Sequence, residues 1–194
     1  MFMQKKSVNS LTYSALLIAL GILIPMVMPV KVAIGPASFT LASHVPVFLA
    51  MFVSPGVAAV VALGTAFGFL LSMPIVIAMR ALSHLVFALI GAFILAKRPM
   101  IVESPLRFQL FNLFIGIIHT ICEVAVVTAF FMQDQLDAAT YTSGFFYSVI
   151  LLVGVGGLIH SIVDYNIAYA IGKKFGMKFN FPIFREAHQA GLKK

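Results

Sequence analysis

Three pairs of ionisable residues lie four positions apart within long apolar stretches of the sequence. The pairs are Arg80 with His84, His119 with Glu123, and His160 with Asp164. Residues four positions apart share one face of a helix, so each pair can form one wall of a polar interior. A charged side chain at the centre of a bilayer costs at least ~2.5 kcal/mol, so such residues face a protein interior, a wet cavity or a partner ion.

Arg80 offers the most specific chemistry of this set. Its planar guanidinium can bind a carboxylate through two parallel hydrogen bonds, which favours a pocket for a negatively charged molecule. In the competing interpretation, Arg80 neutralises Glu123 across the helix bundle. Counted from the ends of their apolar stretches, both residues lie in the outer half of the membrane. His160 and Asp164 lie nearer the cytoplasm, where a mutual hydrogen bond would help to pack the inner half.

The predicted pocket adds hydrogen-bonding groups to Arg80. We expect His84 and His119 to hydrogen-bond a ligand, and Glu123 to accept a bond from a ligand hydroxyl or amide. His44 is included because Pro46 follows it, and a proline in an apolar helix is tolerated mainly where protein or a cavity satisfies the freed carbonyl. The predicted substrate-binding residues are therefore Arg80, His84, His119, Glu123, His44 and Tyr147.

Two features could close this pocket on its outer side. Tyr141 and Tyr147 lie near the outer end of the last apolar stretch, where their rings could cover a ligand. The segment 29–39 contains proline and glycine and borders the His44 cluster. We expect this segment to act as the gate.

A metal site and a hydrolase are two further alternatives. Imidazole and carboxylate ligands suit zinc or nickel, and the ligands would be His84, His119, Glu123 and His160. No pair matches a recognised zinc motif such as His-Glu-x-x-His, so the sequence favours no metal and no cofactor. A hydrolase would need a nucleophile beside an oriented base, but Ser83–His84 and His160–Ser161 are neighbours in sequence and point apart on a helix. We therefore expect no enzyme.

The elements that carry these residues are expected to be transmembrane helices. The 194 residues are 61% hydrophobic and only 10% charged, with a mean hydropathy of +1.06, values that no soluble domain of this size would tolerate. At ~1.5 Å per residue, the segment 75–96 that carries Arg80 reaches across a bilayer core of ~30 Å. The composition predicts an all-α integral membrane protein with a single membrane domain over residues 1–194.

Six spans are predicted from the apolar stretches and the prolines, glycines and charges between them. Their approximate bounds are 9–30, 37–53, 57–72, 75–96, 108–132 and 143–171. The second and third are at the short limit for crossing a bilayer. The first span carries Ala15 and Ala19, and small residues four positions apart let another helix approach closely.

The charge distribution predicts the orientation. With six crossings and the N-terminus inside, all but two of the 13 Lys and Arg residues are cytoplasmic, the exceptions being Lys31 outside and Arg80 in the membrane. This arrangement satisfies the positive-inside rule and places both termini in the cytoplasm. Topology thus explains the net charge of +7, and no nucleic-acid partner is needed. The basic tail from Lys173 is expected to lie against anionic lipid or a cytoplasmic partner.

Taken together, these features resemble the substrate-binding S component of an energy-coupling factor (ECF) vitamin transporter. The resemblance rests on six short spans, a length near 190 residues, both ends inside, Ala15-x-x-x-Ala19, and the run from Pro36 to Ser54-Pro55, and it covers essentially the whole chain. It implies a bundle in the bacterial plasma membrane that captures a small vitamin near its outer side. It also implies docking through the alanine motif onto a shared T component, which two ATPase subunits drive. The chain itself has no phosphate-binding Walker A loop, so energy must come from elsewhere.

The substrate is predicted from Arg80 and from departures from the family's patterns. The absence of tryptophan is unlike thiamine binders, and Met1-Phe-Met-Gln lacks the histidine on which cobalt and nickel members rely. Arg80 favours a vitamin with a carboxylate, with pantothenate as first choice and niacin as the alternative. A pyridoxine or pyrimidine compound fits if Arg80 is taken up by Glu123. A freestanding carrier coupled to protons through Glu123 or Asp164, and a purely structural subunit, are the alternatives of a different class.

Overall fold

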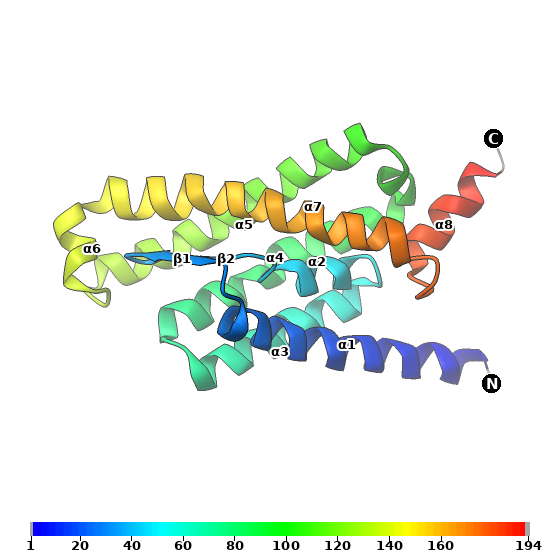
Figure 1. Cartoon of the computed structure of the whole chain (residues 1–194), viewed down its shortest axis with the longest axis horizontal. Helices are drawn as coiled ribbons and strands as arrows, with labels where there is room; N and C mark the ends of the chain where they lie inside the picture. Colours follow the sequence, from blue (N-terminus) through cyan, green and yellow to red (C-terminus); the bar gives the residue numbers. More distant parts are fainter. Residues whose placement is uncertain (1, 193–194) are drawn as a thin grey trace.

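The structure is a computed structural model, and it describes residues 2–192, with side chains from residue 8 onward. The described part is a bundle of helices with one short β-hairpin (Figure 1). In chain order its elements are α1 (Phe2–Val27), β1 (Lys31–Ile34), β2 (Ala37–Thr40), α2 (Val45–Met51), α3 (Pro55–Ser72), α4 (Ile75–Lys97), η1 (Pro99–Glu103), α5 (Pro105–Met132), α6 (Ala138–Ser143), η2 (Phe146–Gly156), α7 (Gly157–Phe175) and α8 (Pro182–Gly191).

Within the described residues, five helical segments are long and apolar enough to cross a membrane. They are Val8–Val27, Pro55–Ser72, Ile75–Lys97, Pro105–Met132 and Phe146–Phe175. Five of the six predicted spans are therefore confirmed as candidate spans, to within a few residues. Serine side chains that accept backbone N–H bonds fix two of the starts, Ser54 before α3 and Ser104 before α5, because the first turn of a helix has no internal acceptors.

The predicted second span, residues 37–53, is wrong as a transmembrane helix. The segment begins as strand β2, turns through Ala42 at a φ of 67°, and ends as helix α2, which is only seven residues long. Every residue of α2 is buried, so its apolar surface packs against protein all round, as expected of a core helix. Figure 1 shows α2 between α1 and α3 on one side and α7 on the other.

The turn of the β-hairpin before α2 lies against α6. Lys31 pairs with Thr40 and Ile34 with Ala37, so the strands are joined by a two-residue turn. Gly35 in that turn has a φ of +54°, and a Cβ there would lie 3.3 Å from the Thr140 hydroxyl on α6. The turn therefore needs glycine both for its backbone conformation and for its close contact with α6.

The inner strand of the hairpin lies against the last spanning helix. A Cβ at Gly156 would lie 2.7 Å from the ring of Phe39, so the absence of a side chain there lets strand β2 approach. Gly156 ends η2, a π-helical stretch that continues directly into α7. Interruptions of this kind inside longer helices are frequent at functional sites.

The C-terminal tail, predicted to lie against lipid or a partner, packs one of its faces against the rest of the protein. Its helix α8 buries Ile183, Phe184 and Ala187, and the Phe184 ring packs edge-on against Phe52 at 5.0 Å. One face of the tail is thus part of the protein core. The opposite face remains exposed and carries Arg185, Glu186 and His188.

The two described ends of the chain lie toward the same end of the bundle (Figure 1). This arrangement is consistent with an even number of passages along the bundle, the second being made by the hairpin and α2 instead of a long helix. Four basic residues used in the orientation argument have side chains outside the described part: Lys5, Lys6, Lys193 and Lys194. Cytoplasmic termini therefore stay a prediction.

Candidate functional site

A cavity that is partly open to the surroundings lies between the helices and the β-hairpin. Helices α1, α3, α4 and α5 contribute to its wall together with β2 and the start of α2. Its polar lining residues are Ser38, Thr40, Ser43, His44, Thr65, Arg80, His84 and Glu123. The rest of the wall is largely apolar and includes Val47, Phe69 and Ile77. Small-molecule sites have this mixture of an apolar wall and a few polar groups.

Arg80 and Glu123 form a two-pronged ion pair across the cavity wall. Arg80 Nε donates to Glu123 Oε1 at 3.2 Å and Nη2 donates to Glu123 Oε2 at 3.1 Å. Arg80 Nη1 donates to the carbonyl of Pro36 at 2.9 Å, which ties the hairpin turn to α4. The neutralising role considered for Arg80 is therefore present in the structure. Arg80 also lines the cavity, so pairing with Glu123 and facing a ligand are compatible.

The guanidinium keeps two N–H groups beyond these contacts. Arginine has five N–H donors, and its bonds to Glu123 and Pro36 use three of them. One of the remaining donors is on Nη1 and the other is on Nη2. Arg80 can therefore donate to a second carboxylate without giving up Glu123.

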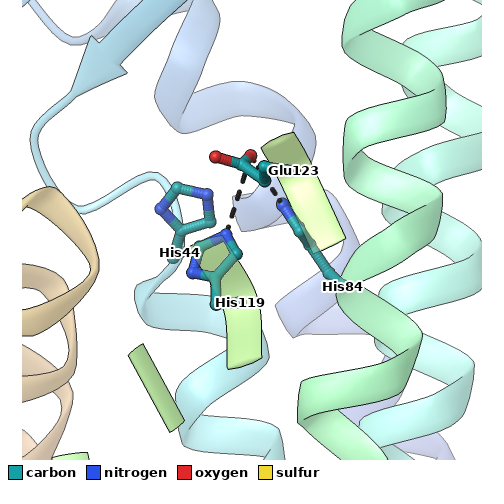
Figure 2. A group of neighbouring side chains, drawn as sticks. All are labelled: His44, His84, His119 and Glu123. Atoms are coloured by element: carbon teal, nitrogen blue, oxygen red, sulfur yellow. Dashed lines mark hydrogen bonds and ion pairs between the residues drawn. The ribbon is translucent and has the colours of Figure 1, made fainter. Parts of the chain in front are cut away.

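Four imidazoles gather beside this ion pair. Figure 2 shows His44, His84 and His119 turned toward one another and toward Glu123. The centroid of the His44 ring lies 4.9 Å from that of His84, 4.7 Å from that of His119 and 4.9 Å from that of His160. His84 Nε2 lies 3.3 Å and His119 Nε2 lies 3.6 Å from Glu123 Oε1. The cluster is thus centred on the carboxylate and on His44.

Asp164 on α7 fixes the position of His44. Its carboxylate is fully buried and accepts the backbone N–H of Ala42 at 2.8 Å and of His44 at 2.9 Å. The Asp164 Oδ2 atom also lies 3.3 Å from His44 Nδ1. The carboxylate therefore holds the turn at the start of α2, where a negative charge interacts favourably with the helix N-terminus.

This geometry corrects the predicted separation of the polar pairs. Asp164 was expected to bond His160 in a separate inner cluster, but its hydrogen bonds go to residues 42 and 44, and His160 Nε2 lies 3.5 Å away. His160 instead contacts the Ser43 hydroxyl at 3.1 Å. Because His44 touches both groups, the two clusters are one continuous network.

We expect Asp164→Ala to destabilise the fold more than a surface substitution does. The change removes two buried hydrogen bonds to a charged acceptor, each of which contributes about 1.5–3 kcal/mol. The predicted loss is about 3 kcal/mol or more, measured as a lower thermal unfolding midpoint of the protein in detergent. Glu186→Ala, at an exposed position on α8, is the matched control. Equal midpoints for the two variants would show that the turn is held by other contacts.

The structure brings together five of the six predicted substrate-binding residues. Arg80, His84, Glu123 and His44 line the cavity, and His119 lies behind them with only 1% of its surface exposed. Tyr147 does not join them, since its side chain is 46% exposed and lies outside the cavity lining.

Tyr141 does not cover the cavity either. Its hydroxyl donates to the carbonyl of Phe131 at 3.2 Å and accepts the Leu136 N–H at 3.2 Å. It therefore holds the connection between α5 and α6 in place. The hairpin does reach the cavity, through Ser38 and Thr40.

The alanine pair on α1 lies on the outside of the bundle. Ala15 and Ala19 are exposed, whereas Ser14 and Leu17 on the adjoining face are buried. An exposed pair of small side chains one turn apart is a surface that another helix can approach closely.

The amino-acid sequence is similar over nearly its whole length to that of a known transport protein. No family profile matches the chain, and no solved structure matches it. The niacin transporter NiaX of Lactococcus lactis subsp. cremoris (strain MG1363) is 46% identical over 192 residues, which cover 98% of this chain and 85% of the relative. The chain therefore belongs to the S components of ECF vitamin transporters. It is a multi-pass protein of the bacterial cell membrane.

Proposed function

We propose that this chain is the substrate-capture subunit for niacin uptake. The observation that carries the proposal is the 46% identity to a niacin transporter over 98% of the chain. Pantothenate, the first choice from the sequence, is not supported by this relative, and the niacin alternative fits better. The reason is that a buried arginine indicates a carboxylate without distinguishing the vitamins that carry one.

The chemistry of the cavity agrees with niacin as substrate. Niacin in its acid form, nicotinate, is a small flat pyridine ring with one carboxylate. The two remaining N–H groups of Arg80 suit the carboxylate, and apolar residues such as Phe69 and Ile77 suit the ring faces. The hydroxyls of Ser38 and Thr40 at the cavity wall can bond the ring nitrogen.

Uptake in this proposal depends on partners that supply energy. The chain has no Walker A loop, so we assign ATP hydrolysis to two ATPase subunits and coupling to a shared T component. The exposed pair Ala15 and Ala19 on α1 is the surface that we assign to the T component. The hairpin over the cavity, tied to Arg80 through the Pro36 carbonyl, is the assigned gate.

Mass spectrometry of released small molecules tests the substrate. Cells that express the protein are grown with equal amounts of isotope-labelled nicotinate, pantothenate and pyridoxine, and the protein is purified in detergent and denatured. We expect about one labelled nicotinate per chain and neither of the other vitamins, both from the wild type and from Tyr147→Ala, whose side chain lies outside the cavity. Recovery of pantothenate alone would overturn the assignment to niacin, and recovery of no vitamin would favour the proton-coupled carrier.

A further inference from the structure

The four side chains in Figure 2 have the composition of a transition-metal site. His44, His84, His119 and Glu123 each offer one ligand atom, and these atoms all lie within 4.8 Å of one another. All four residues are buried. Three imidazoles with one carboxylate are ligands that suit zinc and its neighbours in the first transition row. We propose that this group binds one divalent metal ion of the zinc type.

The spacing of the ligand atoms fits a tetrahedral ion. Ligand atoms about 2.0–2.2 Å from zinc at tetrahedral angles stand about 3.3–3.6 Å apart. The distances from Glu123 Oε1 to His84 Nε2 and His119 Nε2 are 3.3 and 3.6 Å. Two of the six edges of the tetrahedron are therefore already at the required length.

His119 carries an independent sign of a ligand. Its Nε2 atom is buried and has no hydrogen-bond partner among the described residues. Its other nitrogen, Nδ1, lies 2.9 Å from the hydroxyl of the fully buried Ser161. A histidine whose Nδ1–H donates to a fixed oxygen presents the lone pair of Nε2, and metal-binding histidines are oriented in this way.

His44 is oriented by a carboxylate in the same manner. Its Nδ1 atom lies 3.3 Å from Asp164 Oδ2, and Asp164 is itself held by two backbone N–H groups. A carboxylate on the far nitrogen of a metal-binding histidine fixes its tautomer and raises its basicity. A second group that contains His44 consists of His44, His160 and Asp164; the unpartnered Nε2 of His119 favours the group with Glu123.

The charges around the site accommodate a divalent ion. With neutral imidazoles, which is the form that binds metals, Arg80 contributes one positive charge, and Glu123 and Asp164 contribute two negative charges. The local sum is −1, and a divalent ion changes it to +1. His44, His84 and Glu123 border the open cavity, so an ion has an access path. The absence of a zinc motif along the sequence is explained because the ligands come from three separate segments.

Metal binding by the full-length protein, purified in detergent on a tag without histidine, tests this inference. The protein is stripped with a chelator and reloaded with Zn²⁺ or Co²⁺. We expect one ion per chain and, for Co²⁺, the intense visible absorption of a tetrahedral site. His119→Gln removes a direct ligand, so it should weaken zinc affinity by more than the roughly 10- to 100-fold that loss of a residue supporting a ligand costs. His188→Gln, at an exposed histidine on α8, should bind zinc like the wild type.

Two further variants and one further measurement make the outcome decisive. His160→Gln should keep its zinc, and loss of zinc in His160→Gln but not in His119→Gln would overturn the assigned ligand set. If His119→Gln fails to fold, a rise in the wild type's unfolding temperature with Zn²⁺ that Ser161→Ala reduces supports the site. A stripped wild type that takes up no zinc overturns the proposal. Nicotinate binding is measured separately on the same samples, so failure of the metal site leaves the niacin assignment standing.

Discussion

Replacing Arg80 with glutamine should lower nicotinate affinity by about 100-fold or more. Two hydrogen bonds from the guanidinium to a carboxylate, at about 1.5–3 kcal/mol each, are lost, and every 1.4 kcal/mol is about tenfold in the dissociation constant. Nicotinamide, which carries no negative charge, should lose far less. Isothermal titration of both compounds into the purified protein measures the difference. Equal losses for the two compounds would show that Arg80 shapes the site without binding the carboxylate.

The ion pair with Glu123 makes the control variants essential. Removing one partner of a buried ion pair leaves an uncompensated charge, which costs about 3–5 kcal/mol, so Arg80→Gln alone is expected to lower the unfolding midpoint. The double variant Arg80→Gln with Glu123→Gln restores charge balance and should recover the midpoint without recovering nicotinate binding. Glu123→Gln alone should keep most of the binding, because the guanidinium then remains. A loss in Glu123→Gln as large as in Arg80→Gln would assign the effect to the ion pair.

The long helices could be predicted from the sequence because hydropathy is a local property. Each of the five candidate spans is a largely apolar run bounded by Pro, Ser or other polar residues, and lipid forces such a run to satisfy its backbone groups within the helix. The segment 37–53 is equally apolar, but for a different reason. Its helix α2 is surrounded by protein, and composition alone does not distinguish burial in lipid from burial in a protein core.

Most residues of the site could be predicted from the sequence, but only some of the contacts between them could. Arg80, His84, His119 and Glu123 could be predicted because ionisable residues inside apolar helices need polar surroundings, and His44 because Pro46 follows it closely. The role of Asp164 was not identified, since its partners are backbone groups more than a hundred positions away in the sequence. Ser161 was considered only as a nucleophile beside His160. Its contact is with His119 on a neighbouring helix, which no sequence spacing shows.

Tyr147 shows that the position of a residue along a membrane span does not give the direction of its side chain. Its distance along the last span places it near the outer end of the predicted pocket. The direction of its side chain depends on the rotation of that segment about its axis, and η2 is wound as a π-helix, which changes the angle between successive residues. The ring is therefore exposed, whereas Ser148, its neighbour in sequence, is buried and donates to the Thr140 carbonyl at 3.0 Å.

Enlarging the alanine pair on α1 should abolish niacin uptake while leaving niacin binding unchanged. Ala15 and Ala19 are exposed and contribute nothing to the cavity lining, so tryptophan at both positions leaves the site intact. Two large rings one turn apart would prevent close approach of a partner helix, and close backbone approach is what stabilises helix pairs in lipid. Uptake of labelled nicotinate by cells that also express the T component and the ATPases measures the first effect, and titration of the purified protein measures the second.

The matched control places the same bulk on a different face of the bundle. Leu110 and Phe114 are four positions apart on α5 and are 63% and 48% exposed, so Leu110→Trp with Phe114→Trp enlarges a lipid-facing pair in the same way. This control should transport nicotinate like the wild type. If it loses uptake as completely as the α1 variant, the bulk of the rings disturbs the protein generally, and the alanine pair is not the docking surface. If the α1 variant transports normally, the T component must bind elsewhere, because a motif that depends on small side chains cannot accept two tryptophans.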